Sequence, residues 1–160
     1  MKMLARLALV AALVFSGSLA SAASLVATSA KGKIEITAKT LAGLPRQSVT
    51  ATAHDKSATY QGYDLIAVLR AAGLAPTESL RGKQLGELVT ISAADGYRVV
   101  FSLAELDPML GNRQVLLVDS ENGRPLSAAD GPWRLVVPAD QRPARWIRQI
   151  SVINVSQAGP

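Results

Sequence analysis

The alternation of apolar and polar residues predicts strands early in the chain. In residues 33–38, Ile34 and Ile36 alternate with polar side chains, which is the period-two pattern of a half-buried strand. Residues 48–53 are rich enough in β-branched side chains to predict a second strand. Residues 23–32 are small and polar, and we expect them to form an irregular start. The first third of the chain therefore predicts a small sheet.

A helical pattern follows in residues 63–72. Leu65, Val68 and Leu69 are spaced at i, i+3 and i+4, so they share one face of an amphipathic helix. Gly73 stands where a helix commonly ends with a residue in the left-handed conformation. The pattern therefore predicts one helix that packs a single apolar face on the core.

Residues 87–101 predict a β-hairpin, and the apolar pattern selects its register. A two-residue Asp-Gly turn would mix apolar and polar side chains on both faces of the hairpin. A three-residue loop, residues 94–96, gathers six apolar side chains on one face and places Gly96 in the left-handed conformation. Those six side chains are Val89, Ile91, Ala93, Tyr97, Val99 and Phe101. The second register is the prediction.

The remaining elements complete an α+β order. Residues 102–105 have the sequence of a capping box that opens a second short helix. Residues 115–118 form a continuous apolar run, which is typical of a strand buried on both faces. Further strands are predicted at residues 133–137 and 146–155. Strands, helix, hairpin, short helix and strands predict an α+β fold with a mixed or antiparallel β-sheet and two short helices.

Residues 1–22 have the pattern of a signal peptide. Lys2 and Arg6 give a positively charged start, and residues 7–19 are almost wholly apolar. The small residues Ala20, Ser21 and Ala22 then provide a site for signal peptidase, with cleavage after Ala22. The pattern predicts that the mature chain begins at residue 23.

The signal also predicts the route of export. Its basic residues are separated, so it lacks the twin-arginine pair that marks export of folded proteins, and a Sec-type route is expected. The apolar run is shorter than the about 20 residues of a membrane-spanning helix, so no span is expected after cleavage. The chain has no cysteine, which excludes a lipoprotein anchor. We expect residues 23–160 to form a single domain in the periplasm or outside the cell.

Composition excludes several kinds of site. The formal charge of +5 is mild and the bases are interspersed with acids, so a nucleic-acid partner is not expected. The absence of cysteine removes disulfides and thiolate ligands, and a single histidine excludes a multi-histidine metal site. That histidine, His54, lies in a polar stretch and is interpreted as a solvated turn residue. No residue pattern identifies catalytic residues, and no metal site is expected.

A cluster of arginines is the one concentrated chemical feature. Arg134, Arg142, Arg145 and Arg148 lie close together in the sequence, beside Trp146. Guanidinium groups suit phosphate or carboxylate, and an indole offers a face for stacking. The cluster predicts either a pocket for an anionic ligand or a solvated edge whose arginines pair with acids. Composition alone favours the solvated edge.

The same region carries a resemblance to a known family. Residues 131–138 read Gly-Pro-Trp-Arg-Leu-Val-Val-Pro, and Arg145-Trp146 leads into the last predicted strand. This pattern resembles the closing part of the sulfite-oxidase-type molybdopterin-binding domain, and the resemblance extends over residues 41–155. It implies that family's fold and an anionic pterin cofactor contacted by basic residues. By position, Arg134 and Arg145 match two of the family's basic residues.

The resemblance leaves three hypotheses. Catalytic members of the family ligate molybdenum through a cysteine thiolate, and this chain has no cysteine. The leading hypothesis is an exported, non-catalytic domain that binds a small anionic ligand or a periplasmic protein partner. One alternative is a functional molybdopterin-dependent oxidoreductase, or a subunit of one, with non-cysteine metal ligation. Another is a structural subunit whose arginines form a protein interface. The resemblance alone implies molybdopterin as a cofactor.

Overall fold

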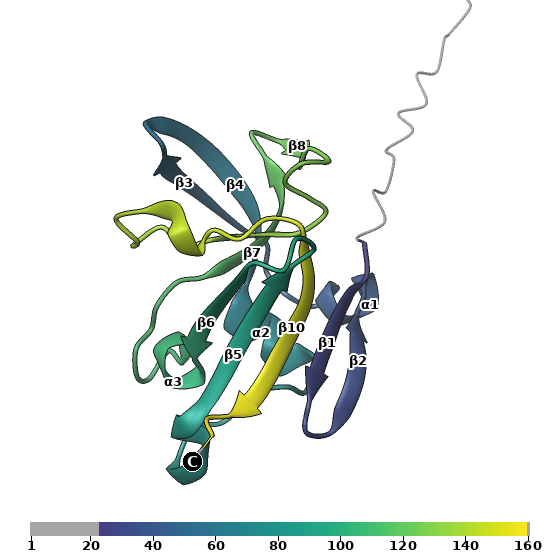
Figure 1. Cartoon of the computed structure of the whole chain (residues 1–160), viewed down its shortest axis with the longest axis vertical. Coiled ribbons are helices and arrows are strands. Elements are labelled where there is room, and N and C mark those ends of the chain that lie inside the picture. Colours follow the sequence, from purple (N-terminus) through teal and green to yellow (C-terminus); the bar gives the residue numbers. More distant parts are fainter. Residues whose placement is uncertain (1–22, 160) are drawn as a thin grey trace, which may run out of the picture.

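Two sheets of five strands organise residues 23–159, which the computed structural model describes (Figure 1). The first sheet contains β1 (Leu25–Ser29), β2 (Gly32–Ile36), β5 (Glu87–Ala93), β6 (Arg98–Ser102) and β10 (Ile150–Gln157). Its order is β2-β1-β10-β5-β6, so the strand that comes last along the chain lies at the centre of the sheet. The β1–β10 pair is parallel and the other pairs of this sheet are antiparallel.

The second sheet contains β3 (Gln47–Ala53), β4 (Lys56–Asp64), β7 (Leu116–Glu121), β8 (Arg124–Pro125) and β9 (Arg134–Val136). Its order is β3-β4-β7-β8, and β9 pairs with β7. Three α-helices connect the strands within the described residues: α1 (Ala38–Leu41), α2 (Leu65–Ala71) and α3 (Leu103–Leu106). Two 3-10 helices, η1 (Gly82–Gly86) and η2 (Pro143–Arg145), complete the fold. Among residues 23–159, no helix has the length and apolar character needed to cross a membrane.

The mixed α+β fold confirms the predicted class, and the β5–β6 hairpin confirms the predicted register. Ile91 pairs with Val99, and the N–H of Ala93 donates a hydrogen bond to the carbonyl oxygen of Tyr97. Gly96 has φ +87°, which a side chain would disfavour. Five of the six expected side chains are buried, but Tyr97 is 51% exposed because it lies beyond the paired part of the hairpin.

Three boundary predictions were wrong. Residues 23–32 are not irregular, because β1 pairs in parallel with β10, a contact that the local sequence does not encode. The predicted helix began too early, since β4 continues through Asp64 and α2 starts at Leu65. The last strand begins at Ile150 rather than residue 146, because Gln149 adopts φ +47° and interrupts the extended chain. The short helix α1 was not predicted.

The core joins the two sheets and includes α2. Strand β7 has the burial expected of a central strand, with Leu116, Leu117 and Val118 fully inaccessible. Trp133 is almost completely buried, and its indole N–H donates a 2.8 Å hydrogen bond to the carbonyl oxygen of Ala23. This contact ties the first described residue to the core. Full burial of one such side chain contributes about 1.5–3 kcal/mol, so these residues dominate the stability of the domain.

Candidate functional site

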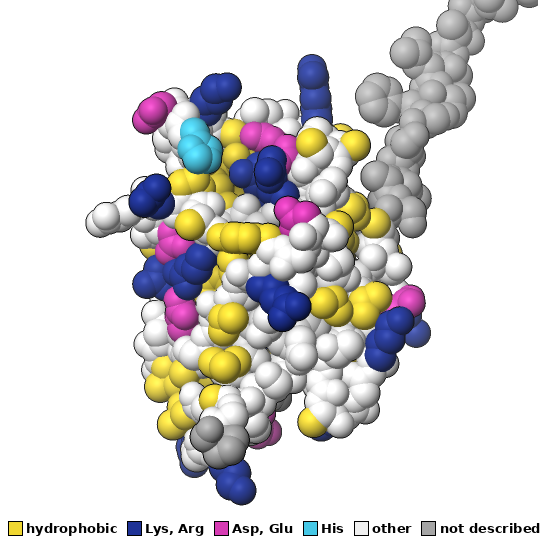
Figure 2. All heavy atoms as spheres, in the orientation of Figure 1, with side chains coloured by type: hydrophobic (Ala, Val, Ile, Leu, Met, Phe, Trp, Pro, Cys, Tyr) yellow, Lys and Arg dark blue, Asp and Glu magenta, His cyan; other side chains and the backbone are white. Residues whose placement is uncertain are grey.

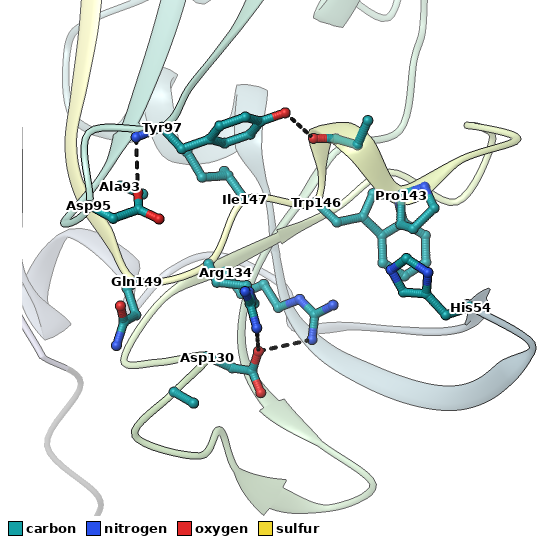
Figure 3. A pocket seen from close by; sticks show the side chains of 13 residues that line it. His54, Ala93, Asp95, Tyr97, Asp130, Arg134, Pro143, Trp146, Ile147 and Gln149 are labelled. Carbon is teal, nitrogen blue, oxygen red and sulfur yellow. Dashed lines mark hydrogen bonds and ion pairs between the residues drawn. The ribbon is translucent and has the colours of Figure 1, made fainter.

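A pocket of about 440 Å³ lies where four separate segments meet (Figure 3). The segments are the turn between β3 and β4, the turn between β5 and β6, residues 129–134, and residues 143–149. The side chains of Tyr97, Trp146 and Ile147 supply apolar surface. The charged side chains of its lining are Asp95, Asp130, Arg134 and Arg148, with His54 also present. The pocket is therefore small and carries both signs of charge.

Arg134 has an incompletely satisfied guanidinium group. Its side chain is only 12% exposed, and its nearest acidic atom is Oδ1 of Asp130, 3.6 Å from Nη1. The Nε atom is buried and has no hydrogen-bond partner within residues 23–159. The guanidinium carbon also lies 5.3 Å from the centre of the Tyr60 ring. A buried donor without a partner costs about 1–3 kcal/mol, so an anion that accepts its hydrogen bond would bind favourably.

Arg148 converges on the same carboxylate from the protein surface. Its side chain is 62% exposed, and Nη1 lies 3.7 Å from Oδ1 of Asp130. The other oxygen of Asp130 accepts a 2.9 Å hydrogen bond from the hydroxyl group of Ser127. Two guanidinium groups therefore share one acidic oxygen, and neither approaches it within normal hydrogen-bond distance. This arrangement leaves donors available to a ligand (Figure 3).

Arg145 has a different environment, because acidic side chains engage it closely. Its Nε and Nη2 atoms donate to the two oxygens of Asp140 at 2.8 and 2.7 Å. Nη1 donates to Glu105 at 3.1 Å, and the guanidinium group lies 4.5 Å from the Phe101 ring centre. The hydrogen bond from Arg145 lowers the pKa of Asp140, and the same contact raises the pKa of Arg145. The charge of Arg145 is therefore compensated within the protein.

Helix α3 and a second arginine complete this ion network. The backbone N–H of Glu105 donates a 3.0 Å hydrogen bond to the Ser102 hydroxyl, which caps α3 and positions the carboxylate. Arg113 contacts the same carboxylate at 2.9 Å and Asp140 at 3.4 Å. Two arginines and two acids thus form a neutral cluster. Figure 2 shows the wider pattern, in which basic and acidic side chains alternate over this face of the molecule.

The structure separates the five residues of the predicted ligand site. Arg134, Trp146 and Arg148 line the pocket, whereas Arg142 and Arg145 do not. Arg142 precedes η2, is exposed, and forms no ion pair with the described residues. Trp146 is buried, and its indole N–H donates to the carbonyl oxygen of Val137 at 3.0 Å, so it forms a wall of the pocket. Its ring also meets Tyr60 edge-on at 5.8 Å.

Sequence reasoning missed several residues of the pocket. His54, Asp95 and Asp130 come from three turns that are far apart in the sequence, and no spacing links them. Tyr97 was expected to be buried, but its hydroxyl group donates to the carbonyl oxygen of Ala144 at 3.0 Å and joins the hairpin to η2. Only the turn signal Asp95-Gly96 marked this part of the chain.

Known proteins share this two-sheet α+β fold. Residues 46–160 match the family described as the oxidoreductase molybdopterin binding domain, and the chain belongs to this family. The resemblance found in the sequence is therefore confirmed.

A solved structure shows the same fold. The sulfane dehydrogenase SoxCD from Paracoccus pantotrophus is similar with a TM-score of 0.62 at 19% sequence identity. The alignment covers 84% of this chain and 38% of that chain, so this chain spans well under half of the length of its structural relative. A comparison with curated proteins gives no match.

The family's cofactor fits the pocket only in part. An anionic group would find the unpartnered donor of Arg134. Arg145, which the sequence resemblance was expected to place at a basic position of the family, already donates to Asp140 and Glu105. The chain contains no cysteine, and residues 23–159 contain no group of three or more His, Cys, Asp or Glu side chains that could hold a metal. These residues therefore do not fit a molybdenum centre ligated through protein sulfur.

Proposed function

We propose that this chain is an exported, non-catalytic member of the family that binds a small anionic ligand at Arg134 and Arg148. The observation that carries the proposal is the buried Nε of Arg134, which has no hydrogen-bond partner among the described residues. The predicted signal peptide supports export, although residues 1–22 lie outside the described residues. The unpartnered donor of Arg134 therefore favours binding of an anion, and the predicted signal peptide favours a location outside the cytoplasm.

The shape of the pocket favours a small molecule over a protein partner. Its volume of about 440 Å³ lies within the range of small-molecule sites, roughly 300–1,000 Å³. The Arg134 side chain is recessed, so a flat protein surface would not reach its donors. A carboxylate, sulfate or phosphate group could accept hydrogen bonds from the two arginines in place of Asp130, whose contacts with them are long.

The available chemical groups support binding without catalysis. The chain offers no thiolate, and its single histidine has no Ser–His–Asp context. Asp95 and Asp130 line the pocket, and the Asp130 carboxylate already lies beside the guanidinium groups of Arg134 and Arg148.

Calorimetric titration of the chain comprising residues 23–160 with inorganic phosphate tests the proposal. Loss of a charge-assisted hydrogen bond of about 1.5–3 kcal/mol predicts that Arg134→Gln weakens phosphate binding at least tenfold. Arg142→Gln is the matched control, because it removes the same charge from an exposed position outside the pocket. Equal affinity of Arg134→Gln and the native chain, or an equal loss in Arg142→Gln, would show that the pocket is not the binding site.

Analysis of the protein purified from its native source tests the remaining parts of the proposal. We expect the intact mass to begin at residue 23 and molybdenum to be far below one atom per chain. Molybdenum and pterin near one per chain would overturn the non-catalytic assignment. Retention of residues 1–22 would overturn the assignment to the exported form.

A further inference from the structure

The turn between β3 and β4 has a left-handed backbone conformation although it contains no glycine. Ala53 pairs with Lys56, so His54 and Asp55 form a two-residue turn. Their φ angles are +49° and +65°, in the left-handed region. Two-residue turns of this kind are occupied preferentially by Asn-Gly, because glycine adopts positive φ without a steric penalty and asparagine adopts it more readily than histidine.

The same chain contains the relaxed version of this turn. Glu121 pairs with Arg124 across the β7–β8 turn, and the two residues between them are Asn122 and Gly123, with φ of +51° and +74°. Asn122 also uses its side chain locally, since Oδ1 accepts a 3.0 Å hydrogen bond from the N–H of Thr59. No corresponding hydrogen bond involves the His54 side chain within residues 23–159. Turn formation therefore does not explain the histidine.

The position of His54 offers another explanation. A second hollow of about 390 Å³ adjoins the pocket, and His54 and Arg134 are the two residues that line both. In Figure 3 the imidazole lies on the Pro143 side of the pocket, away from Asp95. His54 is exposed at the rim, whereas Arg134 is recessed. The imidazole of His54 therefore lies at the entrance and the guanidinium group of Arg134 lies inside, and both border the two hollows.

We propose that His54 contacts the bound anion directly, and that the left-handed turn holds its imidazole at the rim for this purpose. The inference rests on the proposed function of the pocket. An imidazole N–H and a guanidinium group are both donors, so the ligand must present acceptor oxygens in at least two directions. This geometry selects a tetrahedral oxyanion, such as phosphate, sulfate or an ester of either, over a halide. Strain retained at a binding position is a recognised property of functional turns.

The charged side chains around His54 are of both signs. In the first hollow it shares the lining with Arg134, Arg148, Asp95 and Asp130. The second hollow is also lined by the charged side chains of Lys56 and Glu121. The acids balance the bases, so a ligand gains from directed hydrogen bonds to His54 and Arg134 more than from an excess of positive charge.

The single histidine of the chain provides a direct readout. In an untagged chain of residues 23–160, every imidazole signal in the nuclear magnetic resonance spectrum belongs to His54. Titration with inorganic phosphate should shift these signals with the same saturation curve that calorimetry gives. In Arg134→Gln the same shift should require at least tenfold more phosphate, because this variant weakens anion binding and leaves the histidine in place.

A pair of turn variants separates binding from stability. His54→Asn should weaken phosphate binding about fivefold or more and raise Tm by about 2–4 °C, since asparagine accepts positive φ. Asp55→Asn relaxes the other residue of the turn, so it should also raise Tm, and its affinity should be unchanged or higher.

The outcomes distinguish the two proposals. Phosphate binding that depends on Arg134, with unchanged affinity in His54→Asn and no movement of the native imidazole signals, would overturn the role of His54. The proposed function would then stand. If the native chain does not bind phosphate, both are overturned.

Discussion

At the scale of single residues, the distance to the nearest carboxylate decides what each arginine can do. Arg145 meets Asp140 through two hydrogen bonds of 2.7 and 2.8 Å, so its donors are occupied. Arg134 meets Asp130 at 3.6 Å, beyond hydrogen-bond distance, and its Nε has no partner among residues 23–159. The two side chains are chemically identical and close in the sequence. Each carboxylate is only four or five residues away from its arginine, so the folded geometry, and not the sequence spacing, gives the two arginines different roles.

The ion pair of Asp140 and Arg145 should make stability depend on pH in the acidic range. Because Arg145 lowers the folded-state pKa of Asp140, the pair stabilises the protein above the ordinary aspartate pKa of about 3.9. This contribution is lost as the pH falls through the lower folded-state value. Asp140→Asn should therefore reduce the free energy of unfolding by about 1–2 kcal/mol at pH 7 and by progressively less below pH 4.

Thermal unfolding of both proteins from pH 7 to pH 2.5 measures this effect. Glu78→Gln is a suitable control, because Glu78 is exposed and forms no ion pair with the described residues. A gap between the native protein and Asp140→Asn that stays constant over the whole range would contradict the assignment.

At the scale of elements, local patterns predicted what local interactions determine. The β5–β6 hairpin register followed from apolar alternation and one glycine, because its turn and its buried face agree. Strand β1 could not be predicted, because its small residues become a strand only when β10 lies beside them. The ligand site has the same limit. Its arginines were found because they lie in one stretch of sequence, whereas His54 and Asp95 reach the pocket only through tertiary structure.

Two glycines in strands and turns should differ sharply in their tolerance of alanine. Gly96 has φ +87° but open space where a Cβ would lie, so Gly96→Ala should cost about 1–2 kcal/mol of conformational free energy. At Gly62 a Cβ would collide with the backbone of Leu117, where β4 and β7 shift register. Gly62→Ala must separate two paired strands and should cost more than about 3 kcal/mol. Chemical denaturation of the two variants measures the difference, and equal costs would contradict it.

At the scale of the whole molecule, β10 joins parts of the chain that are far apart. It lies between β1 and β5, and without it the first sheet divides into the β1–β2 and β5–β6 hairpins. Isolated hairpins are at best marginally stable in water.

Removal of residues 150–160 should therefore abolish cooperative unfolding. Circular dichroism during heating and limited proteolysis would show this, since the truncated chain should lack a sharp transition and be degraded rapidly. Removal of residues 159–160 alone should change little, because they follow β10. Cooperative unfolding of the longer truncation would show that the two hairpins form a stable domain without the central strand.

The central place of β10 also sets the order of events during synthesis. Residues 25–29 cannot complete their sheet until residues 150–157 have left the ribosome, because the two segments are direct neighbours. A growing chain therefore remains incompletely folded until residues 150–157 have been made, and contacts between such distant segments form slowly. Delayed folding of this kind suits a polypeptide that is threaded through a membrane before it folds.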